Sequence, residues 1–249
     1  MELTLKRVVW ITGGSRGIGR AAAVFLAKMG CNIAVGYKAN QQMADDLVEE
    51  LTSIGCQALA VQVDVADVAS VAQAHKQIKD TLGPVEVLVN SAGVVRDNLF
   101  LMLNEDDWRD VIDTNLLGTV NASKAVIRDM MMKRWGRIIN ISSVAGTKGG
   151  RGQSNYAATK GAVEALTRSL AVELCSRNIT VNAIAPGVIE TDMSSQVRKL
   201  AHDEIMNRQL IKRYGTPEEI AAWIGFVASD YSSYLTGQTI LLDGGLKMP

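Results

Sequence analysis

Tyr156 and Lys160 are residues whose types and spacing suggest chemistry. They stand in "SNYAATKGAVEAL", a stretch of small residues that predicts a helix. Side chains four positions apart share a helix face, so the Lys160 ammonium is expected beside the Tyr156 phenol. A free phenol has a pKa of about 10, and a nearby cation favours its ionised form. The pair predicts a proton donor with a lowered pKa, with a surface tyrosine–lysine stack as the plain alternative.

A serine adds a third polar group to this candidate site. "RIINISS" reads as a buried strand, and Ser143 ends it thirteen residues before Tyr156. The carboxyl ends of parallel strands face the ligand cleft in open α/β sheets. The hydroxyl is therefore placed to bind a carbonyl oxygen beside the phenol. Ser142 is the alternative, because the two serines are adjacent.

A glycine-rich turn, "TGGSRGIG", follows the first predicted strand and opens the first helix. Gly13 permits the tight turn, Gly17 lets the backbone approach a diphosphate, and Gly19 allows close helix packing. A simple strand-to-helix connection is the alternative, but the position of the turn in a βαβ unit favours dinucleotide binding. Because no lysine follows the last glycine, a P-loop for nucleoside triphosphates is disfavoured.

The end of the second predicted strand bears on the choice of dinucleotide. NAD-binding proteins usually carry an acidic residue there, which bonds the ribose hydroxyls. This sequence reads "VGYKAN", with Tyr37 and Lys38 at that place. Arg16 in the glycine turn adds a second cation, and a guanidinium matches the geometry of a phosphate. The sequence therefore predicts NADP(H) as the cofactor.

The elements that must position these residues alternate between short apolar strands and longer helices. The expected strands are "RVVWIT", "CNIAVGY", "QALAVQVD", "VEVLVN", "GRIINIS", "ITVNAIAP" and "QTILLD". Such runs are typical of parallel strands covered on both faces, and they predict a Rossmann-type, doubly wound, seven-stranded α/β sheet. No linker or repeat interrupts residues 1–249, so one domain is expected. Residues 187–214 follow a strand end and suit a mobile substrate lid, or else a plain surface excursion.

Composition narrows the class of protein further. The 249 residues carry 26 Lys plus Arg and 26 Asp plus Glu, which argues against a field that attracts nucleic acid or anionic membranes. Cys31, Cys56 and Cys175 lie far apart and are expected to be buried thiols in a reducing cytosol, and no metal site is expected. No export signal or long apolar run is present, so we expect a cytoplasmic protein.

Taken together, these residues resemble the classical short-chain dehydrogenase/reductase family over essentially the whole chain. The matching motifs are "TGGSRGIG", "NSAG", "DTNLLG", "YAATK" and "APG". The resemblance implies that Tyr156 is the proton donor, and that Lys160 lowers its pKa and binds the nicotinamide ribose. It also implies that Ser143 orients the substrate and that Asn115 anchors a water leading protons toward Lys160.

The same resemblance assigns the cofactor site. Asn90 is expected to shape it, and Asp64 matches the adenine-binding position. The cofactor contacts that it implies are Gly13, Ser15, Arg16, Gly17, Ile18, Gly19, Tyr37, Lys38, Asp64, Val65, Asn90, Ala92, Gly93, Tyr156, Lys160, Pro186, Gly187, Ile189 and Thr191.

Within the family, the sequence is most similar to bacterial 3-oxoacyl-[acyl-carrier-protein] reductases. This similarity implies NADPH-dependent reduction of a 3-oxoacyl thioester on acyl carrier protein, in fatty acid or polyketide-type biosynthesis. It also implies a homo-oligomer, usually a tetramer, and carrier-protein contacts at Arg134 and Arg177 beside the cleft. Lys148 and Arg151 give the loop "SSVAGTKGGRG" more positive charge than expected, which leaves open the acyl group or a specialised carrier protein.

Two other functions remain open from the sequence. One is a reductase of the same fold that acts on acetoacetyl-CoA or on another ketone or alcohol. The other is a non-catalytic NADP-binding sensor, which is disfavoured because Asn115, Ser143, Tyr156 and Lys160 are all present.

Overall fold

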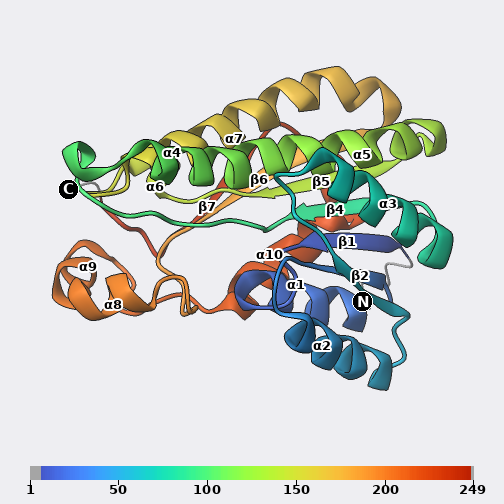
Figure 1. Cartoon of the computed structure of the whole chain (residues 1–249), viewed down its shortest axis with the longest axis horizontal. Helices are drawn as coiled ribbons and strands as arrows, with labels where there is room; N and C mark the ends of the chain where they lie inside the picture. The colour runs from blue at the N-terminus through green and yellow to red at the C-terminus, as the bar shows by residue number, and fades with distance from the viewer. Residues whose placement is uncertain (1–6, 248–249) are drawn as a thin grey trace.

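A single parallel sheet of seven strands organises the protein (Figure 1). The structure is a computed structural model and describes residues 7–247. The strand order is β3-β2-β1-β4-β5-β6-β7, so the winding reverses between β1 and β4, where such sheets bind ligands. The strands are β1 (Val8–Thr12), β2 (Asn32–Tyr37), β3 (Ala58–Gln62), β4 (Val87–Asn90), β5 (Gly136–Ile141), β6 (Ile179–Pro186) and β7 (Thr239–Leu242). All seven predicted strands are confirmed.

Helices cover both faces of the sheet, as the continuous apolar strands predict. In Figure 1, α1, α2 and α10 lie on one side, and α3, α4, α5 and α7 lie on the other. The α-helices are α1 (Gly17–Lys28), α2 (Gln41–Ser53), α3 (Val68–Leu82), α4 (Glu105–Val111), α5 (Gly118–Lys133), α6 (Ala145–Lys148), α7 (Ser154–Leu174), α8 (Ser195–Leu200), α9 (His202–Arg208) and α10 (Pro217–Ala228). Shorter turns are η1 (Phe100–Met102), η2 (Ile112–Leu117), η3 (Cys175–Arg177) and η4 (Asp230–Ser232). Within residues 7–247, no helix is long and apolar enough to cross a membrane.

Two hydrophobic cores result, one on each face of the sheet. Side chains alternate along a strand, so Val9 and Ile11 pack in the core beneath α1 while Trp10 packs in the core beneath α3 and α5. All five residues of β1 are buried. Burial on both faces explains why the strand sequence shows no alternation of polar and apolar residues.

Residues 187–214 form an excursion between β6 and α10, which we call segment 187–214. Figure 1 shows its helices α8 and α9 standing to one side of the sheet. Its base is closed by an isolated bridge between Ile189 and Gly215, with the Glu190 N–H donating to the Gly215 carbonyl at 2.9 Å. Because it follows the carboxyl end of β6, the segment begins at the ligand edge of the sheet.

The cysteines follow the sequence expectation only in part. Cys31 and Cys56 are buried, but Cys175 is exposed. Cys175 lies in η3, beyond the end of α7, and no residue of η3 is buried. The expectation of three buried thiols is therefore wrong for Cys175.

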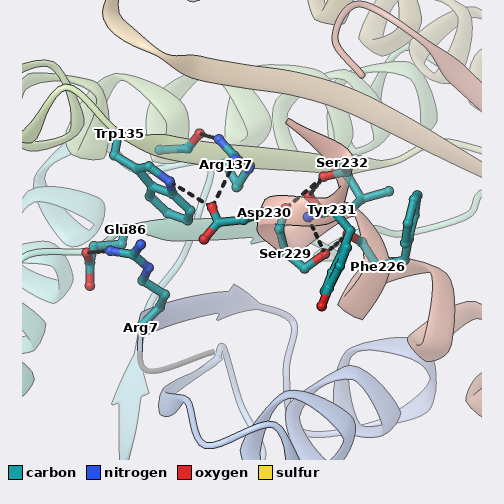
Figure 2. Close-up of polar contacts among 11 residues, drawn as sticks. Arg7, Glu86, Trp135, Arg137, Phe226, Ser229, Asp230, Tyr231 and Ser232 are labelled. Atoms are coloured by element: carbon teal, nitrogen blue, oxygen red, sulfur yellow. Dashed lines mark hydrogen bonds and ion pairs between the residues drawn. The ribbon is translucent and has the colours of Figure 1, made fainter. Parts of the chain in front are cut away.

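A polar cluster lies at the amino-terminal edge of the sheet, opposite the ligand edge (Figure 2). The Trp135 ring lies between the guanidinium groups of Arg7 and Arg137, at 4.0 and 4.4 Å from its centroid. The Asp230 carboxylate accepts hydrogen bonds from Trp135 Nε1 at 3.1 Å and from Arg137 Nη2 at 3.4 Å. Arg137 is only 3% exposed, so Asp230 in η4 supplies the counter-charge for a buried guanidinium.

We expect Asp230→Ala to lower the free energy of unfolding by about 1–3 kcal/mol, because it removes the acceptor of two hydrogen bonds, one of them from a buried charge. Urea unfolding monitored by circular dichroism measures the change. Asp80→Ala is the matched control, since Asp80 pairs with the exposed Lys76 on the same helix, α3, and its loss should change stability little. Equal stabilities of Asp230→Ala and the wild type would show that the cluster does not stabilise the fold.

Candidate active site

Tyr156 and Lys160 lie in the first two turns of α7, at the carboxyl edge of the sheet. Lys160 is 5% exposed, and its ammonium donates a hydrogen bond to the Ile141 carbonyl at 2.7 Å. The same nitrogen lies 5.5 Å from the centroid of the Tyr156 ring. The helical spacing thus brings the two side chains together as expected, and the lysine also fastens α7 to the last residue of β5.

Burial dominates the protonation of both groups. It raises the pKa of Tyr156 to about 12, against a lowering by the hydrogen bond with Ser143, and the charge of Asp97 adds to the increase. Burial also lowers the pKa of Lys160 to about 8. Without a bound cofactor, the expected lowering of the Tyr156 pKa does not occur. Desolvation of the phenol outweighs the interaction with Ser143, which favours the phenolate. Tyr156 is therefore protonated at neutral pH, the state that a proton donor requires.

The two adjacent serines differ in their contacts. The Ser143 side chain is near enough to Tyr156 to lower the pKa of its phenol, and its oxygen accepts the Ala145 N–H at 3.2 Å. Ser142 is 2% exposed and points to α7, where its hydroxyl meets Glu164 Oε1 at 2.8 Å. The geometry therefore places Ser143, and not Ser142, beside the phenol.

Asn115 lies in η2, a π-helical turn between α4 and α5. Its buried amide pairs with the Val94 backbone, accepting from the N–H at 2.8 Å and donating to the carbonyl at 3.0 Å. A Cβ atom on Gly93 would lie 3.3 Å from Asn115 Oδ1 and 3.8 Å from Lys160 Nζ. Asn115 therefore ties η2 to the chain after β4 and lies close to the lysine.

The glycine turn has the close packing that its sequence predicts. Gly13 and Gly17 have positive φ angles of 63° and 53°, which side chains other than glycine rarely adopt. A Cβ on Gly19 would lie 2.3 Å from the Gly13 carbonyl oxygen, and one on Gly13 would lie 2.8 Å from Ala92 Cα. The turn and the N-terminus of α1 thus form a compact backbone surface with unpaired N–H groups, suited to a diphosphate.

The cations near this turn are not equivalent. Arg16 is exposed at the start of α1, and its guanidinium makes no ion pair with any residue from 7 to 247. Lys38 Nζ lies 2.7 Å from Asp64 Oδ2, so its charge is shared with the predicted adenine-binding residue. Tyr37 is buried and packs in the hydrophobic core. Arg16 is the cation most available to bind a phosphate.

Asn90 and Thr12 hold the strand ends in place. Asn90 is buried and donates to Asn140 Oδ1 at 2.9 Å, so it supports the cofactor edge from within the sheet. The Thr12 hydroxyl accepts the N–H groups of Ser91 and Ala92, each at 3.2 Å. Sequence reasoning gave Thr12 no role, although its place at the end of a strand before the glycine turn was a usable signal.

The remaining predicted cofactor positions border the same edge. A Cβ on Gly17 would lie 3.4 Å from Thr191 Cγ2, so segment 187–214 begins beside the glycine turn. A Cβ on Gly187 would lie 2.7 Å from Asp243 Cα. Positions that are largely or partly buried nearby are Ser15, Ile18, Val65, Pro186 and Ile189.

The two arginines expected to bind a carrier protein lie elsewhere. Arg134 ends α5, and Arg177 lies in η3, 21 residues after Tyr156. At 1.5 Å per helical residue, this separation is roughly 30 Å. The expectation that they border the cleft is therefore wrong within one chain, because α5 carries Arg134 and α7 carries Arg177 to the amino-terminal edge of the sheet.

Comparison with known proteins places this geometry in a family. A family model described as enoyl-(acyl carrier protein) reductase matches residues 13–247. The chain belongs to the short-chain dehydrogenase/reductase family. Among short-chain dehydrogenases with curated names, it is 44% identical to 3-oxoacyl-[acyl-carrier-protein] reductase FabG of Staphylococcus epidermidis, over 96% of this chain and 98% of the relative. It is 43% identical to FabG of Pseudomonas aeruginosa, over 97% and 98%. It is 44% identical to the 3-oxoacyl-[acyl-carrier-protein] reductase of Synechocystis sp., over the full length of both.

The pKa of about 8 that burial gives Lys160 predicts a pH dependence for this short-chain dehydrogenase. The side chain is an ammonium below that pH and a neutral amine above it. If the ammonium binds the cofactor, kcat/KM for the nicotinamide cofactor falls as the pH rises through about 8, because this ratio reports groups of the free enzyme. Initial rates measured across the pH range test this. A profile that stays level to about pH 10, where unperturbed lysine and tyrosine titrate, would contradict it.

Proposed function

We propose that the chain reduces a 3-oxoacyl thioester to the 3-hydroxyacyl thioester, with NADPH as hydride donor and acyl carrier protein as the carrier of the acyl group. The observation that carries the proposal is that Ser143, Tyr156 and the buried Lys160 lie together at the carboxyl edge, with Lys160 Nζ 5.5 Å from the centroid of the Tyr156 ring. Relatives of nearly the same length, at 43–44% identity, are named for this reaction. The reaction would serve fatty acid or polyketide-type biosynthesis.

The residues at the carboxyl edge have complementary tasks in this reaction. A bound NADPH supplies the hydride to the ketone carbon. The Ser143 hydroxyl donates a hydrogen bond to the ketone oxygen, and the Tyr156 phenol transfers its proton to that oxygen as negative charge develops. The Lys160 ammonium stabilises the phenolate that remains, and Asn115, close to Lys160, holds the route by which the proton is replaced.

The cofactor fits the residues present. The N–H groups at the start of α1 suit the diphosphate, and the close packing of Gly13 and Gly19 keeps that surface free of side chains. Arg16 offers an unpaired guanidinium for the 2′-phosphate, with Lys38 as the second cation. No carboxylate ends β2, where NAD-preferring enzymes bond the ribose.

The remaining parts of the proposal concern assembly. We propose that residues 1–249 form one domain in which segment 187–214 is the substrate lid, and that the protein is cytoplasmic. We also propose a homo-oligomer, with a tetramer as the expected form. Large apolar side chains exposed on α5 and α7, such as Met132 and Val172, support self-association.

Enoyl thioester reduction is a second candidate, because the matching family model carries that description. That reaction adds a hydride and a proton across a carbon–carbon double bond. Two neighbouring hydroxyls, those of Ser143 and Tyr156, suit a single carbonyl oxygen better. Reduction of acetoacetyl-CoA or of another ketone uses the same groups and differs in the molecule that bears the ketone.

We expect Tyr156→Phe to reduce kcat by roughly 10²–10⁴-fold, because the substitution removes the positioned acid. NADPH oxidation with a 3-oxoacyl thioester is measured by absorbance, and NADPH affinity by fluorescence, which should change little. Tyr234→Phe is the matched control, since Tyr234 is fully exposed. Retained turnover in Tyr156→Phe would refute the assignment.

The same assay with a panel of substrates separates the candidate functions. The panel compares 3-oxoacyl thioesters on carrier protein and on coenzyme A, a 2-enoyl thioester and free ketones. Highest kcat/KM for the carrier-protein 3-oxoacyl thioester supports the proposal. Preference for the enoyl thioester supports the second candidate, and absence of NADPH oxidation with every substrate supports a sensor.

We expect Arg16→Ala to raise the KM for NADPH by about 10–100-fold, the equivalent of a charge-assisted hydrogen bond. The KM for NADH should change little, because NADH lacks the 2′-phosphate. Arg20→Ala is a matched control, since Arg20 is on the same helix and pairs with Glu50. Lys38→Ala should have a smaller effect because Lys38 also pairs with Asp64. A wild-type kcat/KM that favours NADH would overturn the cofactor proposal.

A further inference from the structure

Lys148 forms a mostly buried ion pair that links distant parts of the chain. It is the last residue of α6, which begins two residues after Ser143. Its Nζ lies 2.6 Å from Asp243 Oδ2 and also donates to the Leu246 carbonyl. The side chains of Lys148 and Asp243 are only 21% and 10% exposed. The loop that carries Ser143 is thereby fastened to the chain just beyond β7.

The chain beyond β7 in turn holds segment 187–214. We call residues 243–247 the C-terminal turn. The Arg208 side chain at the end of α9 donates to the Lys247 carbonyl from Nη2 at 2.9 Å. The Ile211 N–H donates to the Gly244 carbonyl at 3.0 Å. The C-terminal turn therefore lies between segment 187–214 and α6, and in Figure 1 α6, α8 and α9 occupy the same end of the molecule.

The base of segment 187–214 is packed against the same ion pair. The close approach of Gly187 to Asp243 Cα leaves no room for a side chain at position 187. The Val144 N–H donates to the Pro186 carbonyl at 2.9 Å, which joins the residue after Ser143 to the end of β6. A displacement of Asp243 would therefore shift both the start of segment 187–214 and the loop that carries Ser143.

We propose that Lys148 is a positioning residue that holds segment 187–214 against the catalytic loop through the C-terminal turn, and so shapes the acyl-binding side of the cleft. This inference rests on the proposed reduction of an acyl thioester. Without the ammonium, the Asp243 carboxylate keeps the Gly245 N–H as a donor but is left largely buried without a counter-charge, which favours movement of the C-terminal turn toward water. Arg208 and Ile211 would follow, because both are hydrogen-bonded to that turn.

Lys148→Met tests the proposal, because methionine has a similar shape without the charge. We expect kcat/KM for the 3-oxoacyl thioester to fall about 10–100-fold, since small misplacements of positioning groups have effects of that size. The Kd of NADPH should rise by a smaller factor. The variant disturbs only the predicted cofactor contacts at the start of segment 187–214, whereas Arg16 and the glycine turn do not contact the ion pair. Lys148→Arg keeps the charge and should recover most of the activity.

A second measurement does not depend on turnover. Hydrogen exchange of the backbone amides in segment 187–214 should be faster in Lys148→Met than in the wild type, and near the wild-type rate in Lys148→Arg. Lys76→Met is the matched control, since Lys76 pairs with Asp80 at the same 2.6 Å but on the exposed face of α3. If Lys148→Met does not fold, Asp243→Asn takes its place and should give the same changes.

The outcomes separate this inference from the proposed function. Unchanged exchange in segment 187–214 together with wild-type kcat/KM in Lys148→Met would overturn the positioning role. An equal loss of NADPH binding and thioester turnover would also overturn it, since that pattern indicates general disruption. If the wild type reduces no acyl thioester, the proposed function fails, and the exchange experiment still decides whether Lys148 holds the segment.

Discussion

The hydrogen bond from the buried Lys160 ammonium to the Ile141 carbonyl is the contact on which the site depends. It joins α7, which carries Tyr156, to the end of β5, which leads into Ser143. A buried ammonium needs a partner, so this bond sets how α7 is seated on the sheet. The phenol and the serine hydroxyl meet as a consequence. The same burial lowers the pKa of Lys160 to about 8 and raises that of Tyr156 to about 12.

The cofactor side is built on a different constraint, the close approach of backbone to backbone. Gly13 and Gly19 pack against each other, and Gly13 also packs against Ala92 in the chain after β4. Thr12 ties the same two chain segments together by accepting two backbone N–H groups. The surface that results presents main-chain donors and few side chains. A large anionic group can approach such a surface closely, because few side chains stand in its way.

The substrate side is assembled from parts that are distant in the sequence. Segment 187–214, the C-terminal turn and α6 meet through hydrogen bonds and the Lys148–Asp243 ion pair. These contacts are fewer and more polar than those of the two hydrophobic cores. Segments held in this way open more easily than core elements, as substrate-binding regions generally must.

Much of the fold and site was predictable because the signals are local. Seven apolar runs marked the strands, and the spacing of Tyr156 and Lys160 placed their side chains on one helix face. Three expectations did not hold. Cys175 is exposed in η3, after the end of α7. Arg134 and Arg177 lie at the far edge because they follow the ends of α5 and α7. The pKa of Tyr156 is raised by burial, which a sequence does not reveal.

By itself, the sequence determined the elements, their order and the residue types available for chemistry, since turn residues and hydrophobic patterns act over a few positions. The tertiary structure alone decided which of Ser142 and Ser143 meets the phenol, that Lys38 shares its charge with Asp64, and that Lys148 reaches Asp243. These pairings depend on how helices seat on the sheet and on how much water each group loses. Both are properties of the packed chain rather than of any stretch within it.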